Sequence, residues 1–237
     1  RRSSDLMIDE INEYYGLNKS NLHKLFDKVE NEIEGRICHS SIILIKILCE
    51  LKDIKNYLEI GVHNGGSMGL MITNKNSTNL FGIDLFEDMY DINKHYNSEK
   101  YNKYQYFKRD NLNIEKTKSN LNKIKSLYKF NPNIVLMQGN SYFNETENIF
   151  KETIKSNTLD LLFIDGDHTN EGVKNDFDRY SKYVKQDGYI IFDDYHHEEI
   201  KKYCDQLLKN NKDYTLIGMF KSDLTPAIDL LIKKNTE

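Results

Sequence analysis

The feature that most constrains the fold is a series of short apolar runs separated by longer amphipathic stretches. The runs are too short for helices and mostly lack polar alternation, as in strands buried on both faces of a parallel sheet. Five such runs occupy residues 57–60, 80–83, 134–137, 161–164 and 189–192. Because helical patterns separate them, we predict an α/β fold with a doubly wound, mostly parallel, Rossmann-like sheet.

The last part of the chain predicts an edge to this sheet. Runs 214–220 and 227–232 are joined by residues that include Pro226. So short a connection is typical of a hairpin and not of a crossover. We therefore expect a seven-stranded sheet with an antiparallel hairpin at one edge.

The chain before the first strand is expected to be helical. Apolar residues recur at helical spacing from Leu6 to Tyr15 and again from Leu22 to Val29, and a third helix is expected over 40–51. This divides the protein into an N-terminal helical segment, 1–54, that packs on the core, and an α/β domain, 55–237. Residues 86–113 form a tyrosine-rich insertion, either a solvated helical excursion or a lid over the ligand crevice.

Charge and cysteine content limit the partners. Thirty-three Lys and Arg oppose 37 Asp and Glu, for a net charge of −4, so we expect no nucleic-acid partner. The longest apolar stretch, 42–51, is well below the ~20 residues of a membrane helix. Three separated cysteines exclude a disulfide framework and favour a cytoplasmic location. A homo-oligomer stays open.

A glycine turn after the first strand indicates a nucleoside site. The sequence from Glu59 to Ser67 reads E-I-G-V-H-N-G-G-S, and Asp84 ends the next strand, near the ~20-residue interval of a ribose-binding carboxylate. His63 stands where a dinucleotide fingerprint needs its second glycine, which favours S-adenosylmethionine. The alternative is a glycine-rich turn without ligand. The candidate cofactor residues are Glu59, Gly61, Asn64, Gly65, Ser67, Asp84, Asn140, Ser141 and Asp165.

Two later strands each end in closely spaced carboxylates. Asp165 and Asp167 follow the fourth strand, and Asp193 and Asp194 follow the fifth. Neighbouring parallel strands would bring Asp165, Asp193 and Asp194 to one rim, where their mutual repulsion invites a divalent cation. Oxygen ligands favour Mg²⁺ or Mn²⁺. The alternative is that Asp167 and Asp194 cap helices or face water.

The same rim offers two candidate catalytic bases. His168 can be neutral near pH 7 and ready to accept a proton. Asp167 beside a cation would be the weaker base, so we favour His168.

From Tyr57 to Tyr195 the chain resembles class I S-adenosylmethionine-dependent methyltransferases. The motifs F-I-D-G-D-H-T-N-E-G-V at 163–173 and F-D-D-Y at 192–195 resemble the metal-dependent sugar O-methyltransferases of the macrocin, mycinamicin and aminocoumarin group. The resemblance implies that Asp165, Asp193 and Asp194 hold the metal and that the glycine motif and Asp84 hold the cofactor. It leaves the base open, since relatives use a histidine or an aspartate.

These features predict a Mg²⁺-dependent O-methyltransferase for a small hydroxylated acceptor such as a sugar or glycoside. The metal would hold two acceptor oxygens and lower the pKa of one hydroxyl. One alternative is a nucleotide-sugar glycosyltransferase that uses Asp165-Gly166-Asp167 as a metal-binding D-x-D motif. The other is a non-catalytic nucleoside-binding module.

Overall fold

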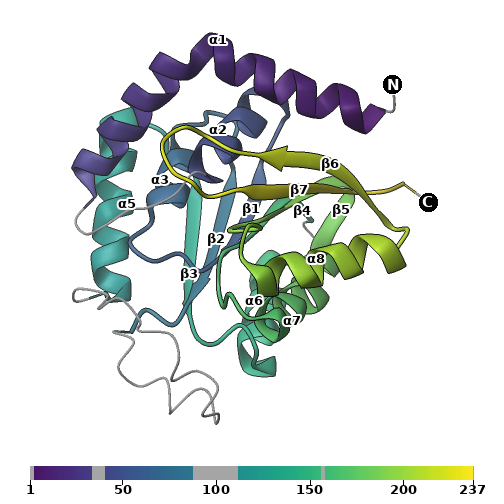
Figure 1. Ribbon diagram of the computed structural model, residues 1–237. Helices are drawn as coiled ribbons and strands as arrows, with labels where there is room; N and C mark the ends of the chain where they lie inside the picture. Colours follow the sequence, from purple (N-terminus) through teal and green to yellow (C-terminus); the bar gives the residue numbers. More distant parts are fainter. Residues whose placement is uncertain (1–2, 34–40, 88–111, 156–157, 237) are drawn as a thin grey trace.

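The computed structural model describes residues 3–33, 41–87, 112–155 and 158–236. Most of the tyrosine-rich insertion predicted over 86–113 therefore lies outside the described residues. The described part holds one seven-stranded sheet with helices on both faces (Figure 1).

The sheet confirms the predicted fold class. Its strand order is β3-β2-β1-β4-β5-β7-β6. The first five strands in chain order pair in parallel, and β7 is antiparallel to both of its neighbours. The strands are β1 (Asn56–Ile60), β2 (Asn79–Asp84), β3 (Asn133–Gln138), β4 (Leu159–Ile164), β5 (Val184–Phe192), β6 (Tyr214–Phe220) and β7 (Asp229–Lys234).

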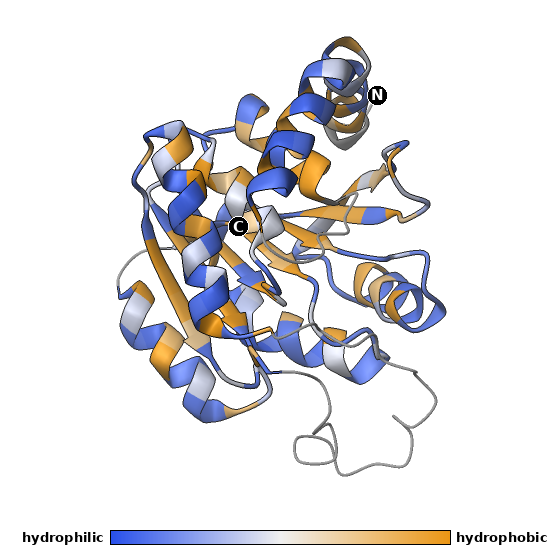
Figure 2. Ribbon diagram, turned by 90° about the vertical axis from the view of Figure 1, so that its left-hand side faces the viewer, coloured by the Kyte–Doolittle hydropathy of each residue, from blue (hydrophilic) through white to orange (hydrophobic). Residues whose placement is uncertain are grey.

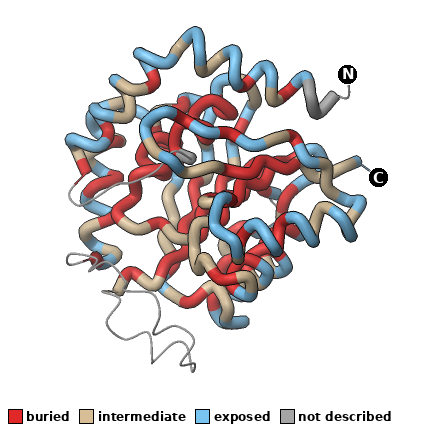
Figure 3. Tube along the Cα trace, viewed as in Figure 1, coloured by how far each residue is buried: buried red, intermediate tan, exposed pale blue. Residues whose placement is uncertain are grey.

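Two hydrophobic clusters, one on each face of the sheet, form the core. Alternate strand residues enter opposite clusters, as Tyr57 and Leu58 do in β1. The first face is covered by α1 (Ser3–Glu32), α2 (Ser41–Leu51), α3 (Gly66–Ile72) and α5 (Ile114–Tyr128). The second is covered by α6 (Asn144–Ile154), α7 (Asn170–Tyr180) with the short η3 (Ser181–Tyr183), and α8 (Glu198–Asn210). Strands β1, β2, β4 and β7 are hydrophobic and buried along most of their length, as Figures 2 and 3 show, whereas β3 and the edge strand β6 are more exposed.

The N-terminal helices differ in one respect from the prediction. The two expected helices before residue 30 are one continuous helix, α1. Gly16 does not interrupt it, because an isolated glycine costs only about 1 kcal/mol in a helix. Buried Ile11 and Val29 anchor its two halves in the same hydrophobic cluster. None of the described helices is long and apolar enough to cross a membrane.

Strand β5 is longer than the apolar run suggested. Asp187 and Gly188, a pair typical of turns, lie inside the strand, where Asp187 has φ 61° and the pairing with β4 shifts register. An irregularity of this kind lets a strand continue through turn-forming residues. The carboxyl end of β5 is unaffected and reaches the same edge as the end of β4.

Candidate active site

The carboxyl ends of β1 and β4 define the site, because the crossovers from these two neighbours run to opposite sides of the sheet. Gly61 leaves β1 with φ 92°, a conformation that favours glycine. A Cβ on Gly61 would lie 1.9 Å from the Asp165 carbonyl oxygen. The glycine loop and the first carboxylate motif therefore touch, which places the predicted cofactor and metal residues side by side.

Asp84 lies at the end of β2 and organises the glycine loop. Its Oδ2 accepts a hydrogen bond from the His63 amide at 2.8 Å, and its Oδ1 accepts one from the Phe86 amide at 2.8 Å. These two backbone bonds fix the orientation of the Asp84 carboxylate beside the glycine loop.

Glu59 lies in the layer beneath this loop and is 1% exposed. It accepts hydrogen bonds from the Ser67 hydroxyl and, at 3.1 Å, from the Tyr57 hydroxyl. The pKa of Glu59 is raised to about 8. Burial is the main cause, the negative charge of Asp84 acts in the same direction, and the two hydroxyls oppose the shift. Glu59 is thus a largely neutral group at pH 7.

The remaining predicted cofactor residues surround the same loop. Gly65 has φ 88° and precedes α3, and Asn64 is buried and anchored by the Asn120 side chain, which donates to its carbonyl at 3.1 Å. Asn140 lies beyond β3, where its Oδ1 accepts from the Tyr142 amide at 2.9 Å. Its buried Nδ2 has no hydrogen-bond partner within the described ranges. That orphaned donor points to a ligand acceptor.

Ser141 follows Asn140 and is half-buried. Its carbonyl accepts a hydrogen bond from the Tyr180 hydroxyl of α7 at 3.2 Å. The loop after β3 is thus tied to the loop and helix after β4, and both border the cofactor region.

His168 links the predicted metal carboxylates. Its Nε2 lies 3.3 Å from Asp165 Oδ1, and its Nδ1 lies 3.5 Å from Asp194 Oδ2. The imidazole therefore stands between the motif after β4 and the motif after β5. Two groups of three potential metal ligands lie there, and within each group the ligand atoms are within 4.8 Å of one another. The groups are Asp165–His168–Asp193 and His168–Asp194–His197, so His168 belongs to both.

Asp193 is the most buried of the three predicted metal carboxylates, at 4% exposed. Burial raises its pKa well above the ordinary value, and the charges of Asp165 and Asp194 raise it further. A divalent cation would remove this repulsion.

Sequence reasoning missed Asp229, the first residue of β7. It is fully buried and interacts with the Asp193 side chain, whose pKa it lowers. The antiparallel pairing of Phe192 with Leu230 brings it there. The only signal in the sequence was one acidic residue at the start of an apolar strand.

Asp167 turns away from this arrangement toward α7. Its Oδ1 accepts from the Thr169 amide and its Oδ2 from the Thr169 hydroxyl, each at 3.0 Å. Thr169 in turn caps α7 by accepting from the Gly172 amide. A Cβ on Gly172 would lie 2.6 Å from the Asp167 side chain. The carboxylate is therefore packed at the beginning of the helix, which supports a structural role.

His196 and His197 lie on the loop after β5. His196 Nδ1 is 3.6 Å from Asp194 Oδ1, and His197 Nε2 is 3.7 Å from Asp194 Oδ2. The amide of Ile228 also donates to His196 Nδ1 at 3.4 Å. Burial lowers the pKa of His197, and Asp194 opposes this shift.

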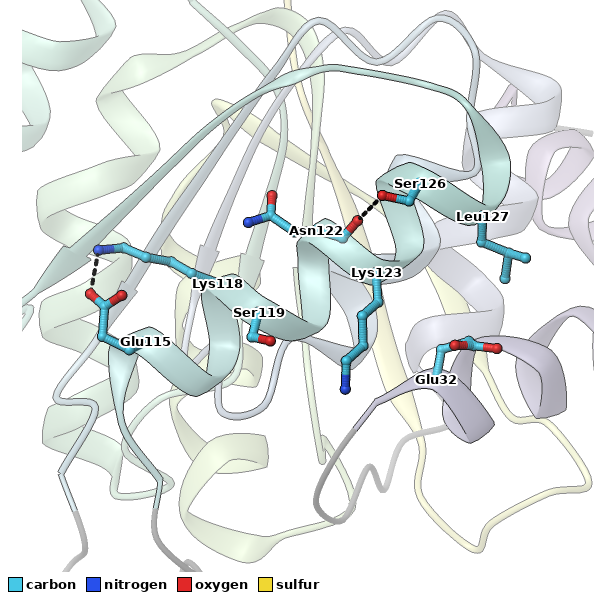
Figure 4. A pocket seen from close by; sticks show the side chains of 8 residues that line it. All are labelled: Glu32, Glu115, Lys118, Ser119, Asn122, Lys123, Ser126 and Leu127. Carbon is cyan, nitrogen blue, oxygen red and sulfur yellow. Dashed lines mark hydrogen bonds and ion pairs between the residues drawn. The ribbon is translucent and has the colours of Figure 1, made fainter.

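A groove of about 850 Å³ lies away from this site, on the outer side of α5 (Figure 4). Glu32, Lys123 and Leu127 line it together with the exposed ion pair between Glu115 and Lys118. It contains none of the predicted site residues. We therefore assign the chemistry to the rim after β1, β4 and β5.

The fold, with its glycine loop beside a carboxylate rim, is that of the class I methyltransferases. Residues 58–195, more than half of the chain, match the family model described as a methyltransferase domain. The chain belongs to this family of methyltransferase domains, which confirms the predicted family resemblance.

A curated relative is the uncharacterised protein R132 of Acanthamoeba polyphaga mimivirus, 34% identical over 171 residues. The match spans 70% of this chain and 64% of that protein.

Solved structures share the fold at low identity. One is the O-methyltransferase TomG of Streptomyces achromogenes, which is involved in tomaymycin synthesis and was solved with S-adenosylmethionine. It is 13% identical, and the match covers 91% of this chain and 89% of TomG with a TM-score of 0.58. The O-methyltransferase NovP is 19% identical, with 83% and 80% covered and a TM-score of 0.58. An rRNA methylase of Streptococcus thermophilus is 10% identical, with 85% and 99% covered and a TM-score of 0.52.

Proposed function

We propose that the protein transfers a methyl group from S-adenosylmethionine to a hydroxyl of a small acceptor, such as a sugar or glycoside, with the help of Mg²⁺ or Mn²⁺. The observation that carries the proposal is the contact between the two halves of the site. Gly61 has no room for a Cβ against Asp165, so a cofactor on the glycine loop lies next to the carboxylate rim. Transfer requires this proximity of donor and acceptor.

Asp84 is the proposed ribose acceptor, held ready by the amides of His63 and Phe86. The orphaned Nδ2 of Asn140 would donate to the base or ribose, with Ser141 beside it. Gly61, Asn64 and Gly65 shape the loop. Glu59 and Ser67 support it from beneath and would face the amino-acid end of the cofactor. When bound, S-adenosylmethionine supplies an electrophilic methyl group.

The metal proposal rests on the donor atoms. Asp165 and Asp193 offer ligand atoms within 4.8 Å of each other and of His168, and the charges of Asp165 and Asp194 raise the pKa of Asp193. Carboxylate oxygens of this kind suit Mg²⁺ or Mn²⁺, so the residues fit the ion. Bound there, a divalent cation would lower the pKa of a coordinated acceptor hydroxyl.

His168 is the proposed base, because it faces the rim and is partly exposed to an acceptor. Its neutral imidazole would take the hydroxyl proton as the acceptor oxygen attacks. Asp167 is the weaker candidate, since both of its oxygens already accept bonds from Thr169.

The test combines binding and turnover. Calorimetry with S-adenosylhomocysteine should show saturable binding. Labelled S-adenosylmethionine should transfer its methyl group to at least one member of a panel of sugars, glycosides and catechols. A chelator should stop this transfer, and added Mg²⁺ should restore it. Methylation of RNA with no transfer to small hydroxylated acceptors would refute the acceptor class. Full turnover in excess chelator would refute the metal.

Several earlier expectations stay predictions. The net charge of −4 still argues against a nucleic-acid substrate. The cytoplasmic location, the homo-oligomer and the division at residue 54 also remain predictions. The family assignment gives no support to the glycosyltransferase or to the non-catalytic alternative.

A further inference from the structure

We propose that His168, Asp194 and His197 form a second metal site, which takes Zn²⁺ and whose occupation inhibits methyl transfer. The affinity for Zn²⁺ is independent of the proposed function. The inhibition rests on the proposed role of His168.

The donor atoms have the separations of ligands on one small ion. His168 Nδ1 lies 3.5 Å and His197 Nε2 lies 3.7 Å from the same oxygen, Asp194 Oδ2. Two ligands on a tetrahedral Zn²⁺ with bonds of about 2.1 Å are about 3.4 Å apart. All three donor atoms fall within 4.8 Å of one another, so small side-chain movements would suffice to enclose the ion.

The donor set selects the metal. Two imidazole nitrogens and one carboxylate suit Zn²⁺ and its neighbours in the first transition series, whereas Mg²⁺ prefers oxygen ligands. The all-carboxylate set of Asp165, Asp193 and Asp194 offers the opposite preference. The rim therefore contains two chemically different groups of ligands that share Asp194.

The backbone holds the three side chains in place before any ion arrives. Asp194 and His197 lie three residues apart in a turn, and the His197 amide donates to the Asp194 carbonyl at 2.8 Å. Asp194 has φ 51° in this turn. His168 comes from the loop after β4, the strand that neighbours β5. Two loops anchored on adjacent strands thus converge on Asp194.

The site is open to solvent and overlaps the catalytic rim. The side chains of His168 and His197 are 37% and 47% exposed, so an ion can enter from the surface. Coordination through Nδ1 uses the lone pair of that nitrogen, and the other ring nitrogen then carries the proton. The proposed base could then accept no proton.

The binding test uses Zn²⁺ and Co²⁺ on the full chain. Competition with a chromophoric chelator should give micromolar or tighter Zn²⁺ affinity in the parent. His197→Ala should weaken it at least tenfold, and Co²⁺ should lose its tetrahedral visible spectrum in the same variant. The matched control is His196→Ala, from the same loop, which should stay within threefold because His196 is outside the set of mutually close donors.

The activity test uses the same variants. Zn²⁺ should inhibit the Mg²⁺-supported reaction in the parent and in His196→Ala. His197→Ala should keep its Mg²⁺-supported turnover, and its inhibition constant for Zn²⁺ should rise at least tenfold. Zn²⁺ affinity unchanged in His197→Ala would overturn the proposed site. Zn²⁺ binding that needs His197 but does not inhibit would overturn only the regulatory part.

Discussion

Replacing the buried Glu59 with Gln should remove a pH-dependent loss of stability. The pKa of Glu59 is about 8 in the folded protein, against an ordinary value of 4.5. Because the folded state holds this proton more tightly, Glu59 stabilises the fold fully below pH 4.5, and the contribution is lost as pH rises through 8. Gln keeps the shape but has no charge to bury. Its carbonyl oxygen can accept from one of the Ser67 and Tyr57 hydroxyls while its amide nitrogen donates to the other.

The size of the effect follows from the two pKa values. With a pKa of 4.5 in the unfolded chain and about 8 in the folded protein, ionisable Glu59 lowers the free energy of unfolding by roughly 1 kcal/mol at pH 5 and by roughly 4 kcal/mol at pH 8, relative to a side chain that stays protonated. The advantage of Glu59→Gln in the free energy of unfolding should therefore grow by about 3 kcal/mol over this range. Urea unfolding of both proteins at pH 5, 6, 7 and 8 measures it.

The control is Glu152→Gln on α6, where the carboxylate is exposed to solvent. Its pH dependence should coincide with that of the parent within error. If the curves for Glu59→Gln and the parent also run parallel, the folded protein does not retain the Glu59 proton and the reasoning is wrong.

Three further predictions concern the proposed chemistry. Asp84→Ala should weaken S-adenosylhomocysteine binding at least tenfold in calorimetry, since a charged acceptor of two hydroxyls contributes about 1.5–3 kcal/mol; unchanged affinity would remove Asp84 from the cofactor site. Asp165→Asn and Asp193→Asn should each lower Mg²⁺ affinity and turnover, and parent-like values in both would contradict the metal assignment. His168→Ala should lower kcat by roughly 10²–10⁴-fold with S-adenosylhomocysteine affinity retained. If Asp167→Asn instead loses activity while keeping its melting temperature, Asp167 is the base.

The sequence alone determined the sheet and the position of its functional edge. The apolar runs predicted all seven strands, and β1, β2 and β4 are buried at nearly every position, as expected for strands covered on both faces. The final hairpin was also predictable, since its short connection allows no crossover. The start of β5 was harder to predict from the sequence. Asp187-Gly188 is typical of a turn, but the strand tolerates the pair as an irregularity.

The candidate site was predictable where residues follow strands directly. Asp84, Asp165 and Asp193 come at the ends of β2, β4 and β5, and parallel strands carry their carboxyl ends to one edge. The glycine loop was also recognisable from the sequence, because it directly follows the first strand. The structure explains its first glycine, since a Cβ on Gly61 would collide with the backbone of Asp165 after the neighbouring strand.

Only the tertiary structure decided the contacts between side chains from separate elements. It turned Asp167 toward α7, placed His168 between Asp165 and Asp194, and brought Asp229 from an antiparallel strand to Asp193. Local sequence carries periodicity and turn signals, which act over a few residues. Side-chain direction after a strand depends instead on how distant loops pack, and that is settled only when the whole sheet and its helices assemble.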